Sequence, residues 1–156
     1  LSITSGLNVG VTRKNNMLTR WVDQGASESI ILLELPNRYL AGLAEVELKE
    51  GYSDKTNWRK MLTNEFTKLD LIKEKKDALD RLSDELKKYK SGNETVYQFN
   101  YNVLNYPKSV KSVSLKKSDQ IKGKLIGIKG QYLIFEDSTV FNIRSNEGYL
   151  VEIDLK

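Results

Sequence analysis

The sequence predicts an α+β protein in which an α/β module with a long helical segment is followed by a small antiparallel β-meander or barrel. Two observations predict this class. Up to about residue 90, short apolar runs alternate with stretches whose apolar residues recur at helical spacing. Beyond Ser91-Gly92-Asn93 the apolar period changes to two, and short strand-like runs follow one another through short turns. We therefore expect two domains, residues 1–90 and residues 91–156.

The chain begins with the pattern of a β-hairpin followed by a helix. Leu1–Thr4 and Leu7–Val11 alternate apolar and polar residues, and Ser5-Gly6 between them is suited to a turn. The helix is capped by Asn15-Asn16 and ended by Gly25. Its apolar positions are Met17, Leu18, Trp21 and Val22.

A buried strand and a second helix are expected next. Ser29–Leu35 contains a continuous apolar run, which is typical of a strand covered on both faces. Pro36 ends the strand, and Asn37 is placed to cap a helix that ends before Gly51. The apolar face of this helix consists of Leu40, Leu43, Ala44 and Leu48.

Helical spacing continues from Ser53 to Tyr89. Asp54 or Thr56 is expected to cap the start, and Trp58 is expected in the core. Further on, a narrow apolar stripe runs among dense charges, as in a helix that packs on one side only. One long helix and two helices broken near Asp70 remain alternatives.

The last part of the chain has the pattern of an antiparallel meander that closes into a small barrel. Each expected strand is short and is bounded by residues suited to turns. The expected strands are Tyr97–Val103, Lys111–Leu115, Gly123–Ile128, Gln131–Phe135, Val140–Arg144 and Tyr149–Leu155.

Composition excludes several kinds of site. Of the 156 residues, 39% are hydrophobic and 29% are charged, and there is no cysteine or histidine. Disulfides, thiolate metal sites and histidine bases are thereby excluded from this sequence. We expect a cytoplasmic protein without membrane contact, because no apolar run approaches about 18 residues and no signal peptide is evident. The chain starts at Leu1 without methionine, so we expect further sequence upstream.

The net charge of +4 is unevenly distributed. Residues 108–129 include seven lysines and one acidic residue, Asp119. This excess of positive charge is compatible with nucleic-acid binding. These lysines are Lys108, Lys111, Lys116, Lys117, Lys122, Lys124 and Lys129.

Two charged residues are candidates for phosphodiester chemistry. Arg20 and Gln24 are neighbours on the first expected helix, and an arginine supplies a forked donor to a phosphate. Glu45 lies off the apolar face of the second helix and is a hard oxygen ligand suited to magnesium. The alternative is that Arg20 and Glu45 are ordinary surface charges or form an ion pair.

Four long motifs resemble an uncharacterised bacterial family known only as a domain of unknown function. They are Val9–Arg13, Thr19–Ala26, Ser53–Leu62 and Ile128–Phe135. The resemblance covers nearly the whole chain apart from residues 73–106. Members usually carry an upstream segment with a cysteine and a tyrosine, and the family supplies no established activity.

The N-terminal half also resembles the GIY-YIG nuclease superfamily, with Asn8-Val9-Gly10 at the second motif triplet. The resemblance implies Arg20 and Glu45 as catalytic residues, with Glu45, or Glu47 as its rival, binding Mg²⁺ or Mn²⁺. Asn8 replaces the expected tyrosine, and Gln24 stands where a histidine is common. Further residues expected to bind substrate are Arg13, Gln24, Lys49, Lys55, Asn57 and Arg59.

These observations lead to one functional expectation and two alternatives. We expect a nucleic-acid-processing module, a metal-dependent endonuclease with an altered site. The alternatives are a non-catalytic nucleic-acid-binding or regulatory protein on the same scaffold, and an assembly module that makes contact through its charged helical segment.

Overall fold

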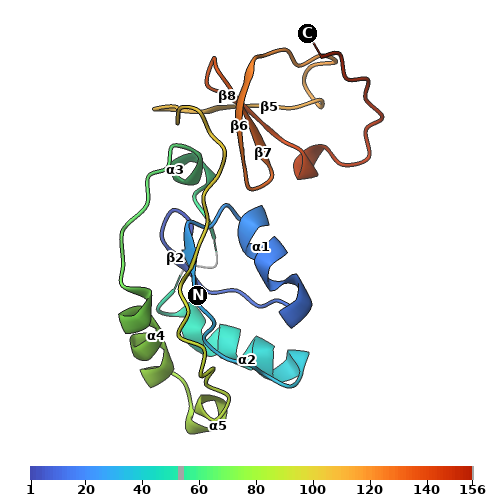
Figure 1. The fold of residues 1–156 in the computed structure, drawn as a ribbon. Coiled ribbons are helices and arrows are strands. Elements are labelled where there is room, and N and C mark those ends of the chain that lie inside the picture. The colour runs from blue at the N-terminus through green and yellow to red at the C-terminus, as the bar shows by residue number, and fades with distance from the viewer. Residues whose placement is uncertain (53–54, 156) are drawn as a thin grey trace.

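The computed structural model describes residues 1–52 and 55–155, and within them the chain forms two four-stranded sheets with helices beside and between them (Figure 1). This arrangement confirms the α+β class. The first sheet has the order β2-β1-β3-β4 and is antiparallel throughout. Its strands are β1 (Ser2–Ile3), β2 (Leu7–Asn8), β3 (Glu28–Ser29) and β4 (Tyr97–Gln98).

The second sheet has the order β5-β8-β7-β6. Its strands are β5 (Lys111–Val113), β6 (Leu125–Lys129), β7 (Tyr132–Phe135) and β8 (Thr139–Asn142), all within segments predicted as strands or one residue beyond them. The predicted closed barrel is wrong, because β5 pairs in parallel with β8 and leaves β5 and β6 as the two edges. The predicted strand Tyr149–Leu155 is also wrong, since this segment pairs with no strand among the described residues and its side chains are exposed.

The first two helices lie where the sequence predicted them. After the short 3-10 helix η1 (Lys14–Asn16), helix α1 spans Met17–Asp23, and Gly25 follows it with a φ of +70°. The predicted cap at Asn15-Asn16 is wrong, because these residues belong to η1 and the Asn16 side chain makes no capping hydrogen bond to α1. Helix α2 spans Arg38–Lys49, and the Asn37 side chain accepts a hydrogen bond from the Leu40 amide at 2.9 Å, as predicted. The strand predicted at 29–35 is shorter than expected, since its sheet partners are only two residues long.

The helical segment after residue 55 consists of three short helices in its described part, so the single long helix is wrong. They are α3 (Trp58–Leu62), α4 (Leu71–Asp80) and α5 (Asp84–Lys87). Asn57 caps α3 in place of Thr56, and the other predicted cap, Asp54, lies outside the described residues. Asp70 caps α4 by accepting from the amides of Ile72 and Lys73, so the break near Asp70 is confirmed.

Two apolar clusters form the core. The first lies between the first sheet and α2, α4 and α5, and includes Ile3, Ile30, Leu48 and Leu86. The second joins α3 to the second sheet through Met61, Leu62, Ile134 and Val140. Trp58 packs against this second cluster, as predicted, with its ring stacked on Tyr132 at 5.8 Å between centroids.

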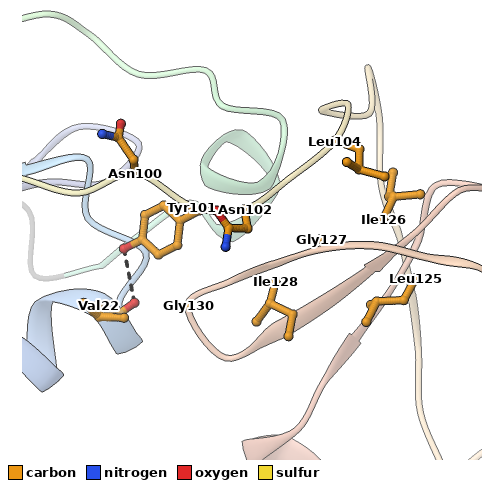
Figure 2. Close-up of a pocket in the computed structure, with 10 residues that line it drawn as sticks. All are labelled: Val22, Asn100, Tyr101, Asn102, Leu104, Leu125, Ile126, Gly127, Ile128 and Gly130. Atoms are coloured by element: carbon orange, nitrogen blue, oxygen red, sulfur yellow. Dashed lines mark hydrogen bonds between the residues drawn. The ribbon is translucent and has the colours of Figure 1, made fainter.

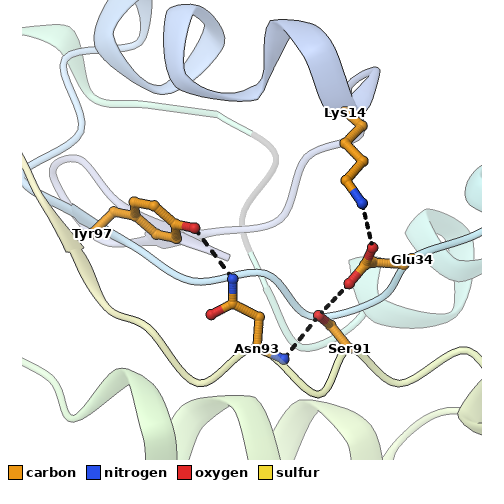
Figure 3. Close-up of polar contacts among 5 residues, drawn as sticks. All are labelled: Lys14, Glu34, Ser91, Asn93 and Tyr97. Atoms are coloured by element: carbon orange, nitrogen blue, oxygen red, sulfur yellow. Dashed lines mark hydrogen bonds and ion pairs between the residues drawn. The ribbon is translucent and has the colours of Figure 1, made fainter.

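The segment that follows α5 is anchored by polar contacts to Glu34, which lies beyond β3, and to Lys75 of α4; Figure 3 shows the contacts of Glu34. Ser91 Oγ donates to Glu34 Oε1 at 2.8 Å, and Lys14 pairs with the other carboxylate oxygen at 3.1 Å. The Ser91 hydrogen bond and then the Lys14 ammonium lower the pKa of Glu34. The ammonium of buried Lys75 donates to the carbonyls of Ser91 and Asn93, both at 2.8 Å. These contacts bring β4 into the first sheet, and the division of the chain at residue 90 stays a prediction.

The turn between β6 and β7 ties the second sheet to the first half of the molecule. Lys129, only 1% exposed, donates from Nζ to Asn64 Oδ1 at 2.8 Å. Its ammonium also lies 5.4 Å and 5.0 Å from the ring centroids of Tyr101 and Tyr106, within the range of cation–π attraction. At Gly130, with a φ of +59°, a Cβ would lie 2.9 Å from the Asp23 carbonyl oxygen, so the close approach requires glycine.

None of the helices in residues 1–52 and 55–155 is both long and apolar enough to cross a membrane.

The burial of Lys129 predicts a pH-dependent stability. Burial lowers the pKa of its ammonium to about 8. The unfolded chain, with a lysine pKa of about 10.4, therefore binds more protons than the folded chain between these values. The free energy of unfolding should rise by about 2 kcal/mol between pH 7 and pH 9.5.

The measurement is urea unfolding at both pH values, with Lys129→Met as the reference. The substitution removes the titrating group and keeps a long side chain, so the rise should disappear. Tyr101 and Tyr106, whose pKa values are raised by burial, titrate equally in both proteins and cancel in the comparison. An identical pH slope in the two proteins would contradict the prediction.

Candidate functional site

A small polar cleft opens between α1, α2 and the turn that follows the first hairpin. Its volume is about 120 Å³. The backbone and side chains of Val9–Thr12 form one wall, and Leu1 and Ser2 from the first strand contribute to the lining. The helices contribute Arg20, Trp21, Gln24 and Glu45. We call this feature the α1–α2 cleft.

Packing of α1 determines which of its residues face the cleft. Trp21 is 8% exposed, and its ring lies 5.2 Å from that of Tyr97 and 6.1 Å from that of Phe99. Arg20 and Gln24, four residues apart on the helix, therefore lie together on a more exposed side. Gly25 ends the helix at this point, so Gln24 lies next to the turn.

Packing of α2 places Glu45 in the same way. Ala41, Ala44 and Leu48 are buried against the first core cluster or near it. Glu45 is adjacent to Ala44 in sequence and therefore about 100° around the helix from it, at the margin of the buried face. Its rival Glu47 is engaged elsewhere, because its carboxylate accepts from the amide and hydroxyl of Ser83 at 2.8 Å and 3.0 Å.

Arg20 and Glu45 share the cleft without neutralising each other. Among the described residues, neither side chain takes part in an ion pair or a side-chain hydrogen bond. Both are exposed to solvent. The ion-pair alternative considered for these residues is therefore wrong, and the cleft presents one cation and one anion to anything that enters it.

The donors and acceptors of the cleft limit its chemistry. Glu45 is the only carboxylate among the described residues that line it. In the same part of the chain, no group of three or more acidic side chains is arranged to hold a metal ion. A divalent cation at Glu45 would therefore keep most of its own water ligands, which is the usual preference of Mg²⁺.

Several predicted substrate-binding residues lie away from the cleft lining. The Asn57 side chain caps α3, and its backbone N–H donates to Ser5 Oγ at 2.9 Å. The Arg59 guanidinium lies 4.3 Å from the Trp58 ring centroid. Arg13 precedes η1, Lys49 is in the last turn of α2, and Lys55 is exposed before α3. Of the predicted set, the structure brings together Arg20, Gln24 and Glu45.

Asn8, which replaces the tyrosine of the GIY-YIG triplet, is outside the cleft lining. It is 7% exposed, and its Nδ2 donates to the hydroxyls of Thr4 and Thr56. Its Oδ1 has no hydrogen-bond partner among the described residues. The side chain therefore belongs to a buried polar cluster and supplies no proton acceptor to the cleft.

Sequence reasoning missed Ser2 as a cleft residue. Ser2 is 4% exposed and pairs with Ser29 across the β1–β3 ladder. Strand alternation alone predicts which residues share a face but not which face meets a cleft. Thr12 lines the cleft together with Val9, Gly10 and Val11, the other residues of the Val9–Arg13 motif that reach it.

The fold and the cleft define an α+β protein with a polar cleft formed by two helices and the turn that follows the first hairpin. A family model described as "Protein of unknown function (DUF2797)" matches residues 1–151, and the chain belongs to this family. This confirms the resemblance to a family of unknown function. No curated protein and no solved structure matches the chain. The bacterial origin and the GIY-YIG resemblance stay predictions.

The anchoring of α1 by Trp21 is testable by a pair of substitutions on this helix. Trp21→Ala should lower the free energy of unfolding by about 3 kcal/mol, since it removes a large buried ring. Leu18→Ala is the matched control, because Leu18 is 52% exposed and should contribute less than about 0.5 kcal/mol. Urea unfolding measures both. Equal losses from the two variants would show that Trp21 does not hold the helix.

Proposed function

We propose that the chain is a nucleic-acid-processing module that hydrolyses phosphodiester bonds in the α1–α2 cleft with a divalent metal. The observation that carries this proposal is the convergence of unpaired Arg20 and Glu45 from two helices on one cleft. A cation and an oxygen ligand are the two groups that a phosphate and its metal ion require.

Arg20 has the role of holding the phosphate. Its guanidinium can donate two parallel hydrogen bonds to phosphate oxygens, and no other side chain competes for it among the described residues. Gln24, one turn further along α1, adds an uncharged donor on the same side of the cleft. Arg20 and Gln24 together stabilise the negative charge that develops on the nonbridging oxygens of the phosphate.

Glu45 has the role of holding Mg²⁺ or Mn²⁺. A carboxylate is the hard oxygen ligand that these ions prefer, and the exposed position of Glu45 leaves room for water ligands. A metal ion bound there would lower the pKa of a water molecule and stabilise charge on the phosphate. The exposed lysines between residues 108 and 129 favour a polyanionic substrate.

The second candidate is a non-catalytic nucleic-acid-binding or regulatory protein on the same scaffold. The burial of Asn8 favours it, because this position supplies no proton acceptor to the cleft. In this version Arg20 and Gln24 hold a phosphate, and Glu45 has no role in chemistry.

A cleavage assay tests the catalytic version. Single- and double-stranded DNA and RNA are incubated with the full chain in Mg²⁺ or Mn²⁺. Cleavage should fall about 100-fold or more in Arg20→Ala and in Glu45→Gln, since each removes charge stabilisation at the reacting phosphate. Glu50→Gln is the matched control, because Glu50 follows α2 but is not in the cleft lining. Cleavage that survives in Arg20→Ala or Glu45→Gln would overturn the catalytic role of the cleft.

Binding measured without metal separates the two candidates. The logarithm of the association constant should fall linearly with the logarithm of salt concentration, as for any protein that displaces counterions. Arg20→Ala should weaken binding by about tenfold, the usual effect of losing one charge-assisted phosphate contact. If the wild type binds in this way but does not cleave, the binding protein is correct; if Arg20→Ala leaves affinity unchanged, neither candidate acts through this cleft.

A further inference from the structure

A second and larger hollow lies on another side of α1, between the end of this helix, residues 100–104 and β6 (Figure 2). Its volume is about 510 Å³. Four of its apolar side chains remain substantially exposed: Leu104 at 76%, Ile128 at 49%, Leu125 at 47% and Val22 at 41%. Exposed apolar side chains gathered around a hollow mark a contact surface. We call this hollow the interlobe groove.

Two amides without partners line the same groove. Asn100 and Asn102 are exposed, and in the described part of the chain their side chains make no hydrogen bond. Each offers a donor pair and an acceptor, which is the combination that the edge of a nucleobase matches. A mainly apolar hollow that is lined by a few polar groups is the usual form of a small-ligand site.

Tyr101 supplies a fixed aromatic ring at the groove. Its hydroxyl donates to the Ala26 carbonyl at 2.9 Å and lies 3.3 Å from the Val22 carbonyl. The Lys129 ammonium lies 5.4 Å from the centre of the ring. The ring is therefore held by its hydroxyl and by a neighbouring cation while it still lines the groove. A ring held in this way loses little conformational entropy when a planar group stacks on it.

We propose that the interlobe groove binds an unpaired nucleobase of a single-stranded nucleic acid whose backbone lies at the α1–α2 cleft. This inference rests on the proposed function and specifies its substrate as single-stranded. Helix α1 borders both sites, with Val22 in the groove and Arg20 in the cleft. The groove edge also belongs to the lysine-rich segment, where Lys122 is exposed three residues before Leu125 and Lys124 pairs with Glu136 at 2.9 Å. The charge of Lys122, which pairs with no described residue, favours a polyanion over an uncharged or acidic apolar partner.

The test compares two fluorescein-labelled strands by fluorescence anisotropy in EDTA. One is an octamer of thymidine nucleotides, and the other is an abasic deoxyribose-phosphate strand of equal length. The full chain should bind the thymidine strand about tenfold more tightly, within the range that one stacked base provides. Tyr101→Leu should abolish this preference, because it removes the ring.

Two further variants make the result independent of stability. Tyr101→Phe loses the hydrogen bonds to the carbonyls of Val22 and Ala26 but keeps the ring, so it should keep most of the preference. Leu104→Ser changes a side chain that is 76% exposed, so the protein should fold normally and lose about threefold of the preference. Thermal unfolding confirms that each variant is folded.

The outcomes separate this inference from the proposed function. Equal binding of both strands that depends on Arg20 overturns the groove proposal alone. Base preference that survives in Tyr101→Leu and Leu104→Ser overturns it as well. Base preference with no effect of Arg20→Ala overturns the role of the cleft, and no binding of either strand overturns both. A dimer that Leu104→Ser converts to a monomer, without base preference, identifies a second copy as the occupant instead.

Discussion

The arrangement of the two halves depends on the burial of one ammonium group, that of Lys129. A buried cation is costly unless it is paired or hydrogen-bonded, so its environment must be built for it. Asn64 provides the acceptor, and it does so from a backbone φ of +59°, an uncommon conformation for a residue other than glycine. Gly130 then lets the turn approach the backbone at Asp23. These contacts hold β6 against both α1 and α3, and the ring of Tyr101 is positioned between them.

The cleft is held in place by parts of the chain that are distant in sequence. Helix α1 has seven residues, too few for a stable helix in isolation, and its position depends on Trp21 packing against Tyr97 and Phe99. Those rings follow the segment that Lys75 and Glu34 anchor through Ser91. The position of Arg20 therefore depends on contacts about 70 residues further along the chain. Such support from outside the site is what gives a binding site a defined geometry before ligand arrives.

Features with local causes could be predicted from the sequence, and features with distant causes could not. The cap at Asn37, the left-handed Gly25 and the neighbouring positions of Arg20 and Gln24 each follow from a few adjacent residues. Lys129 appeared as one more member of a basic run, because its burial depends on Asn64 and two tyrosines elsewhere. The alternating tail at 149–155 looked like a strand, yet alternation does not supply an edge to pair with. The groove was missed because most of its wall at 100–104 was interpreted as the end of the predicted strand Tyr97–Val103, whereas β4 ends at Gln98.

The proton acceptor is where the two candidate functions differ physically. Glu45 is the only carboxylate that the described residues bring to the cleft, and one carboxylate cannot ligate a cation fully and accept a proton at the same time. Asn8 is committed to Thr4 and Thr56, and its unpaired Oδ1 already costs stability that a cluster of apolar residues would avoid. Phosphate binding requires only Arg20 and Gln24, which this chain supplies. Hydrolysis also requires an activated water molecule. Apart from Glu45, the described residues of the cleft supply no carboxylate that could accept its proton. The two candidate functions therefore both use Arg20 and Gln24 to bind phosphate, and only the catalytic function depends on the carboxylate of Glu45.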